Sequence, residues 1–121
     1  MKYMLLIYGN EELWSSFPQE EMERLVQETD ALSRELTASG ELVGAWGTSD
    51  QEMAKCVTLV DGVPAVTDGP YIEAKEYLGS FDIIDCDSLE RALEIAARVP
   101  FARLGKVEVR PLMHESDSNA F

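Results

Sequence analysis

The segment from Lys2 to Tyr8 constrains the fold most, because it is apolar on both of its faces. It reads KYMLLIY and ends at Gly9-Asn10, and a short run rich in apolar and aromatic residues is typical of a β-strand. Alternate side chains of a strand point to opposite sides, so the two sides would carry Tyr3, Leu5 and Ile7, and Met4, Leu6 and Tyr8. A strand that is apolar on both sides normally lies in a sheet that is covered on both sides.

The patterns in the rest of the chain predict two helices and five further strands. The first helix is expected over 18–39, where apolar residues recur at helical spacing and Gly40 stops the helix. The second starts at Asp87 or Ser88 and ends before Pro100. Its expected buried residues are Leu89, Ala92, Leu93, Ala96 and Ala97. The further strands are expected over 42–46, 55–60, 63–67, 79–86 and 106–112, and Asp61-Gly62 predicts a hairpin between two of them.

This order of elements predicts an α+β fold, a ferredoxin-like split βαβ sandwich with a β-hairpin insertion. A chain of 121 residues is long enough for one domain, expected over 1–113, and 114–121 would form a C-terminal tail. Two helices cover only one face of such a sheet. Covering the other face with a second copy, at ~800 Å² per partner and ~25 cal/mol per Å², would contribute roughly 20 kcal/mol before association costs. We therefore expect a homodimer whose sheets face each other as an α/β barrel, with two equivalent clefts.

Composition excludes several classes of partner. The chain has 23 acidic and 10 basic residues, a net charge of −13, which disfavours nucleic acids and anionic membranes. No apolar run approaches the ~20 residues of a membrane span, and a cytoplasmic protein is expected.

His114 is the only histidine, so a zinc site with three histidines cannot form within one chain. Phosphate-binding loops and nucleophile elbows are absent from the sequence, and neither cofactor nor metal is expected.

A turn and the polar segment behind it supply the candidate catalytic residues. Asp68 precedes Gly69-Pro70, and a carboxylate at a rigid turn can act as a general base or bind a ligand. The alternative is that Asp68 only hydrogen-bonds the backbone of its own turn. Lys75 stands between Glu73 and Glu76, where it could hold an anionic substrate or form exposed ion pairs.

Three residues at strand positions are candidates for binding a ligand. Tyr8 and Trp46 end the first two strands, and they would line a pocket if these strand ends meet. Their alternative role is packing in the core or at an interface. Arg110 points away from Val107 and Val109, toward the expected interface between sheets, where it could bind an anion or pair with a carboxylate such as Glu108.

Three segments together resemble the DGPF family of YCII-related proteins. They are the opening KYMLLIYG, the motif TDGPY at 67–71 with Glu73, Lys75 and Glu76 behind it, and the ending GKVEVRPL at 105–112. The resemblance covers about residues 1–113 and implies a dimeric ferredoxin-like α/β barrel whose function is largely uncharacterised. Some YCII members carry an Asp–His pair in a cleft, whereas the only histidine here is His114, near the C-terminus. Genes of the DGPF branch often lie beside those of extracytoplasmic-function sigma factors.

Two functional hypotheses follow. In the first, the protein binds a small molecule in a dimer cleft and performs acid–base catalysis without a cofactor. Asp68 would then be the base and Lys75 its electrostatic partner, with Tyr8 and Trp46 as walls and Glu73 and Arg110 as further ligand contacts. In the second, the protein is a non-catalytic dimeric binding or regulatory module, whose cleft holds a metabolite or whose acidic surface meets a basic protein partner. The resemblance associates this role with sigma-factor signalling.

Overall fold

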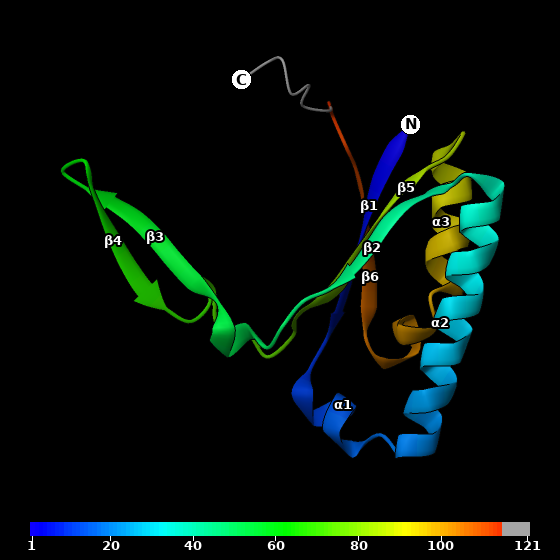
Figure 1. The fold of residues 1–121 in the computed structure, drawn as a ribbon, viewed down its shortest axis with the longest axis horizontal. Helices are drawn as coiled ribbons and strands as arrows, with labels where there is room; N and C mark the ends of the chain where they lie inside the picture. Colours follow the sequence, from blue (N-terminus) through cyan, green and yellow to red (C-terminus); the bar gives the residue numbers. More distant parts are fainter. Residues whose placement is uncertain (115–121) are drawn as a thin grey trace.

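The computed structural model describes residues 1–114 as a sheet covered by helices on one face, with a separate hairpin that projects from it (Figure 1). The strands are β1 (Lys2–Gly9), β2 (Leu42–Gly47), β3 (Lys55–Val60), β4 (Val63–Asp68), β5 (Tyr77–Asp85) and β6 (Lys106–Pro111). The helices are α1 (Glu11–Ser16), α2 (Gln19–Ser39) and α3 (Leu89–Arg98), with the short 3₁₀ turns η1 (Gln51–Met53) and η2 (Pro100–Leu104). Of the expected tail, 114–121, only His114 belongs to the described residues.

The main sheet has the strand order β2-β5-β1-β6, and every neighbouring pair is antiparallel. This is the order of a ferredoxin-like sandwich, so the predicted fold class is confirmed. Strand β1 lies in the interior of the sheet between β5 and β6, and its apolar composition follows from that position. The register places Leu5 opposite Asp82 on β5 and Val109 on β6.

The core lies between the sheet and the helices α2 and α3. Tyr3, Leu5 and Ile7, the first predicted side of β1, are buried there. The other buried members of the same cluster are Leu36, Ile84, Cys86, Ala92, Ile95, Ala96 and Val99. The apolar side chains of β1 therefore hold both helices against the centre of the sheet, which leaves the strand ends available for a site.

The opposite face of the sheet, which we call the open face, has no helix over it within residues 1–114 (Figure 1). The register puts Met4 beside Ile83 and Leu6 beside Phe81 on this face. Glu108 and Arg110 lie on it along the edge strand β6. The second predicted side of β1 is thus apolar and faces away from both long helices, as the sequence indicates.

The buried side of α3 differs from the predicted one. Ala92, Ile95 and Ala96 are buried, whereas Leu89 and Leu93 are 46% and 50% exposed. Positions 92, 95, 96 and 99 recur at helical spacing and face the sheet, so the helix is rotated away from the leucines. Ala97 is exposed as well, so the expectation that Leu89, Leu93 and Ala97 belong to the buried stripe was wrong.

Strands β3 and β4 form a two-stranded hairpin, residues 55–68, which we call the arm. Asp61 and Gly62 form its turn with φ angles of 49° and 79°, as their sequence predicts. The two strands pair only with each other. Figure 1 shows the arm projecting on the side of the open face, away from α2 and α3.

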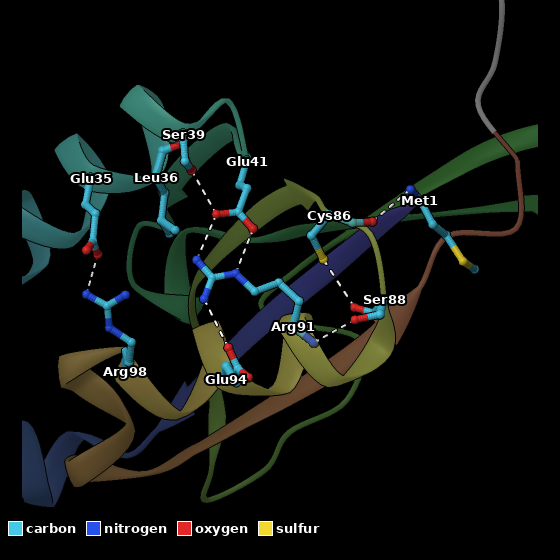
Figure 2. A network of polar contacts seen from close by, with 10 residues as sticks. All are labelled: Met1, Glu35, Leu36, Ser39, Glu41, Cys86, Ser88, Arg91, Glu94 and Arg98. Carbon is cyan, nitrogen blue, oxygen red and sulfur yellow. Dashed lines mark hydrogen bonds and ion pairs between the residues drawn. The ribbon is translucent and has the colours of Figure 1, made fainter.

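A polar network ties the helices together at the end of the sheet that carries the N-terminus (Figure 2). Arg91 on α3 donates two hydrogen bonds of 2.8 Å to the carboxylate of Glu41, which follows α2. These bonds, together with one from Ser39, lower the pKa of Glu41 to about 2. The Met1 ammonium lies 3.0 Å from the Asp85 carboxylate. The network fixes this end of the sheet.

Candidate functional site

A mostly apolar cavity lies at the end of the sheet where β1 stops and β5 begins. It has a volume of about 290 Å³ and lies on the helix-covered side, and we call it the helix-side pocket. Its lining residues come from β1, α1, α2, β5 and η2: Ile7, Trp14, Met22, Gly79, Ser80 and Phe101. Because five elements meet there, the pocket is a product of the tertiary fold.

Trp14 forms one wall of this pocket because α1 turns back over the strand ends. The helix starts at Asn10, whose side chain accepts a 2.8 Å hydrogen bond from the Leu13 N–H. The indole lies directly over Gly9 and Gly79, where an added Cβ would come within 2.4 Å and 2.5 Å of the ring. The Tyr77 ring meets the indole edge-on, with centroids 5.3 Å apart. The two glycines therefore permit the approach that builds the wall.

Two polar groups of this lining have no hydrogen-bond partner within residues 1–114. They are the Ser80 hydroxyl group and the Trp14 indole N–H. An apolar cavity with a few available polar groups is the usual composition of a small-molecule site.

Asp82 adds a carboxyl group next to the helix-side pocket. It follows Ser80 by two positions on β5 and points to the same side of the sheet, so the two Cα atoms are roughly 7 Å apart. Burial raises the pKa of Asp82 to about 6, since desolvation disfavours the charged form. Its carboxylate forms neither an ion pair nor a hydrogen bond with any residue of 1–114. Asp82 is therefore a half-buried acid that titrates near neutral pH.

A second cavity, of about 480 Å³, lies at the root of the arm, and we call it the hinge pocket. It is lined by Tyr8, Thr48, Ser49, Asp50, Gln51, Ala54, Pro70, Ile72, Ala74, Glu76, Tyr77 and Leu78. Burial and the nearby carboxylates of Glu11, Asp50 and Glu52 raise the pKa of Tyr77. A shallower hollow of about 430 Å³ shares Gln51, Pro70 and Ala74 with this pocket and includes Glu73 and Lys75. Tyr77 also contacts Trp14, so the hinge pocket and the helix-side pocket adjoin at one end of the sheet.

The residues predicted from the sequence lie in three different places. Tyr8 lines the hinge pocket, and Glu73 and Lys75 line the adjoining hollow. Asp68 is exposed at the root of the arm, where it forms an ion pair with Lys55, and it lines neither cavity.

The other two predicted residues lie on the open face. Trp46 stacks on Phe81 with ring centroids 5.3 Å apart, and Arg110 forms an ion pair with Glu108. The structure therefore does not bring Asp68, Trp46 and Arg110 into one cavity of a single copy. Their predicted roles stay predictions.

Sequence reasoning overlooked Trp14, Ser80 and Asp82. Asp82 had a detectable signal, because it interrupts an apolar strand at a position that shares its side with Ile84. Trp14 had no such signal in the sequence, because residues 11–17 carry no apolar stripe that would reveal a helix packed on the sheet.

Two searches of residues 1–114 bear on the class of site. None of the helices in this range is long and apolar enough to cross a membrane. The same range contains no cluster of three or more His, Cys, Asp or Glu side chains that could hold a metal ion.

The strand order, the helices on one face and the apolar open face define an α+β protein of the dimeric α/β-barrel fold class. The chain belongs to the family of YCII-related domains, whose model matches residues 1–116. A relative from Rhizobium meliloti (strain 1021), the uncharacterized protein R00369, is 35% identical over 114 residues, covering 93% of this chain and 92% of that protein.

A solved structure has a similar fold. It is 5-chloro-2-hydroxyhydroquinone dehydrochlorinase from Burkholderia phenoliruptrix AC1100, in complex with 2,5-dihydroxybenzoquinone. The TM-score is 0.53 and the sequence identity 16%, with 95% of this chain and 96% of that chain covered. At this identity, the likeness establishes the fold.

Proposed function

We propose that this protein binds a small, mostly apolar organic molecule in the helix-side pocket and uses Asp82 to exchange a proton with it. The observation that carries the proposal is the unpaired, half-buried Asp82 carboxyl group next to an apolar cavity. A volume of about 290 Å³ suits a molecule with a single ring. The indole of Trp14 and the ring of Phe101 provide apolar walls for it.

The raised pKa of Asp82 suits it to acid–base work. With a pKa of about 6, both the ionised and the protonated form are populated near neutral pH. The carboxylate can accept a proton from a C–H or O–H group of the ligand while the bonding electrons stay on the ligand, and it can later return the proton. The Ser80 hydroxyl and the Trp14 indole N–H are available to donate hydrogen bonds to a ligand oxygen. Isomerisation is the reaction type that needs only these steps. Elimination uses the first step alone and requires a ligand whose leaving group departs with its bonding electron pair.

The comparison with the dehydrochlorinase supports the size of ligand that we propose. That enzyme shares the fold, and its structure contains 2,5-dihydroxybenzoquinone, a molecule with one six-membered ring. Neutral dihydroxybenzenes, such as hydroquinone and catechol, are suitable first probes because they do not bring a negative charge to Asp82.

We also propose that a second copy covers the open face. The support is the run of apolar side chains on that face, where Met4 and Phe81 are half-buried and Trp46 is 51% exposed, because a soluble monomer rarely exposes a large apolar patch. Two-fold pairing of this face would give a homodimer with two equivalent clefts.

The hinge pocket gives a second candidate function. Tyr8 lines it, and Glu73 and Lys75 line the hollow beside it, so a ligand there would meet Lys75. Asp68 lines neither cavity and would have to reach the ligand from the root of the arm. The ion pair between Asp68 and Lys55 favours the non-catalytic form of this candidate, a dimeric binding module. Neither the fold nor the relatives support the association with sigma-factor signalling, and it does not form part of the proposal.

The experiment is a titration of ¹⁵N-labelled protein with hydroquinone, followed by NMR. The chain has two tryptophans, so Trp14 in the pocket and Trp46 on the open face each give one indole N–H signal. We expect the Trp14 signal to shift and the Trp46 signal to stay. Asp82→Asn should change the apparent affinity at least about tenfold, and Asp68→Asn should leave it unchanged.

Two outcomes would contradict the proposal. A shift of Tyr8 and Thr48 signals without any shift at Trp14, together with an effect of Asp68→Asn, would move the site to the hinge pocket. If hydroquinone, catechol and other single-ring compounds at millimolar concentration shift no signal, the proposal that the helix-side pocket binds a small molecule is wrong.

A further inference from the structure

The arm carries an uninterrupted apolar patch on one of its two faces. The register pairs Val57 with Val66 and Leu59 with Pro64 on the same face, which we call the apolar face of the arm. Val57, Leu59 and Val66 are 65%, 67% and 63% exposed. The other face carries the hydroxyl groups of Thr58 and Thr67, and its exposed apolar side chains, Val60 and Val63, lie only beside the turn. The two faces of one hairpin therefore differ in the kind of surface that they could contact.

A hairpin of this kind is poorly stable by itself. Two antiparallel strands without a third neighbour or a covering helix are marginal in water. The strands of the arm pair only with each other, and the apolar face has no cover within residues 1–114. The arm therefore needs a contact outside its own domain to lower the free energy of its ordered state.

The accessible surface of the chain shows that it has enough excess area for such a contact. The chain exposes 8664 Å², whereas a compact monomer of 13.5 kDa would expose roughly 6,500 Å². Even if residues 115–121 exposed as much as an extended chain, they would account for roughly 1,100 Å². An excess of about 1,000 Å² remains, which matches the ~800 Å² that each partner buries in a standard interface.

The charge of the chain selects the kind of partner. The net charge is −13, yet the patch formed by Val57, Leu59, Pro64 and Val66 contains no charged side chain. The nearest charges are Asp61 in the turn and the Lys55–Asp68 ion pair at the root. A basic partner would be drawn to the carboxylates elsewhere, whereas an uncharged apolar patch lets a second acidic copy approach with little repulsion.

We propose that the apolar face of the arm docks on the body of a second copy of this chain. The inference rests on the sheet-to-sheet pairing proposed above and adds the arm as a second contact. Figure 1 shows the arm on the side of the open face, so a copy stacked on that face lies beside it. The hinge pocket lies at the root of the arm, and the docked copy closes it.

The test compares two pairs of substitutions on opposite faces of the arm. Leu59→Lys with Val66→Lys disrupts the apolar face, and Thr58→Lys with Thr67→Lys adds the same charge to the same strands on the other face. The mass in solution is measured for each by sedimentation at several concentrations. We expect wild type and the threonine variant to have twice the chain mass of 13.5 kDa. The apolar-face variant should dissociate at least about 100-fold more readily.

A third variant separates failure of this inference from failure of the proposed pairing. Met4→Lys alters the open face and should also weaken the dimer. If Met4→Lys dissociates the dimer while the apolar-face variant stays as tight as wild type, the arm inference is wrong and the sheet pairing stands. A wild type that is monomeric at 100 μM overturns both.

Hydrogen exchange tests the same inference without a substitution. The backbone amides of residues 57–66 should exchange more slowly at high protein concentration than at low concentration, because docking covers the arm. Exchange in the arm that is independent of concentration, while the dimer forms, would overturn the inference.

Discussion

The substitution Asp82→Asn should stabilise the fold above pH 6, which is unusual for a change inside a sheet. The folded protein holds the Asp82 proton up to about pH 6, whereas an unfolded aspartate releases it near 3.8. Stability from this group is therefore complete below pH 3.8 and is lost as the pH rises through 6. Asparagine has nearly the same shape and cannot ionise, so the variant avoids that loss.

The magnitude follows from the two pKa values. A rise from 3.8 to about 6 corresponds to about 3 kcal/mol between the ionised and the protonated form. Because Asp82 keeps partial access to water, we reduce this to about 1–2 kcal/mol at pH 8. At pH 5 the wild-type carboxyl is mostly protonated in the folded state, and the advantage of the variant should fall to about half.

Urea unfolding, followed by circular dichroism at pH 5, 6 and 8, measures the free energies of unfolding. All samples are kept at one protein concentration, because association would also affect stability. Asp30→Asn on the exposed side of α2 is the matched control for the loss of one carboxylate. A variant that is less stable than wild type at pH 8, or an advantage that is equal at pH 5 and pH 8, would refute the reasoning.

Three further predictions concern packing, ion pairing and association. Gly79→Ala should lower the free energy of unfolding by about 1–3 kcal/mol, because the new Cβ would lie 2.5 Å from the Trp14 ring. In the same urea experiment Gly47→Ala, which meets nothing within 4 Å, should have little effect. Arg91→Met should lower the melting temperature most above pH 4.5 and progressively less as the pH falls toward 2, because its partner Glu41 has a pKa of about 2 in the fold and 4.5 otherwise. Melting curves from pH 2 to 8 measure this dependence. Raising NaCl from 20 to 300 mM should tighten the proposed dimer in sedimentation experiments, because salt screens the repulsion between two chains of charge −13.

Much of the fold could be predicted because its signals are local. The alternation in β1, the Asp61-Gly62 turn and Gly40 after α2 each specify a conformation through a few neighbouring residues, and the structure has all three. The rotation of α3 was less predictable. Leu89 and Leu93 compete with Ile95 for the buried side, and only the position of the sheet decides between them.

The candidate site was harder to predict because it depends on long-range contacts. Trp14 reaches the helix-side pocket only because α1 folds back over Gly9 and Gly79, which are far apart in the sequence. Asp82 acquires its raised pKa from its burial in the folded structure, which the sequence does not show. The motif around Asp68 attracted attention because its residue types are distinctive, yet those types also suit the root of a projecting hairpin.

The close approach of the Trp14 indole to Gly9 and Gly79 has an evolutionary consequence. Any homologue that replaces Gly9 or Gly79 with a larger residue must also lose or reposition Trp14, because both cannot occupy the same space. A homologue with a small side chain in place of the tryptophan would be free to vary at both glycines. Positions 9, 14 and 79 should therefore change together across the family. Their joint substitution would identify the lineages in which the helix-side pocket has a different size.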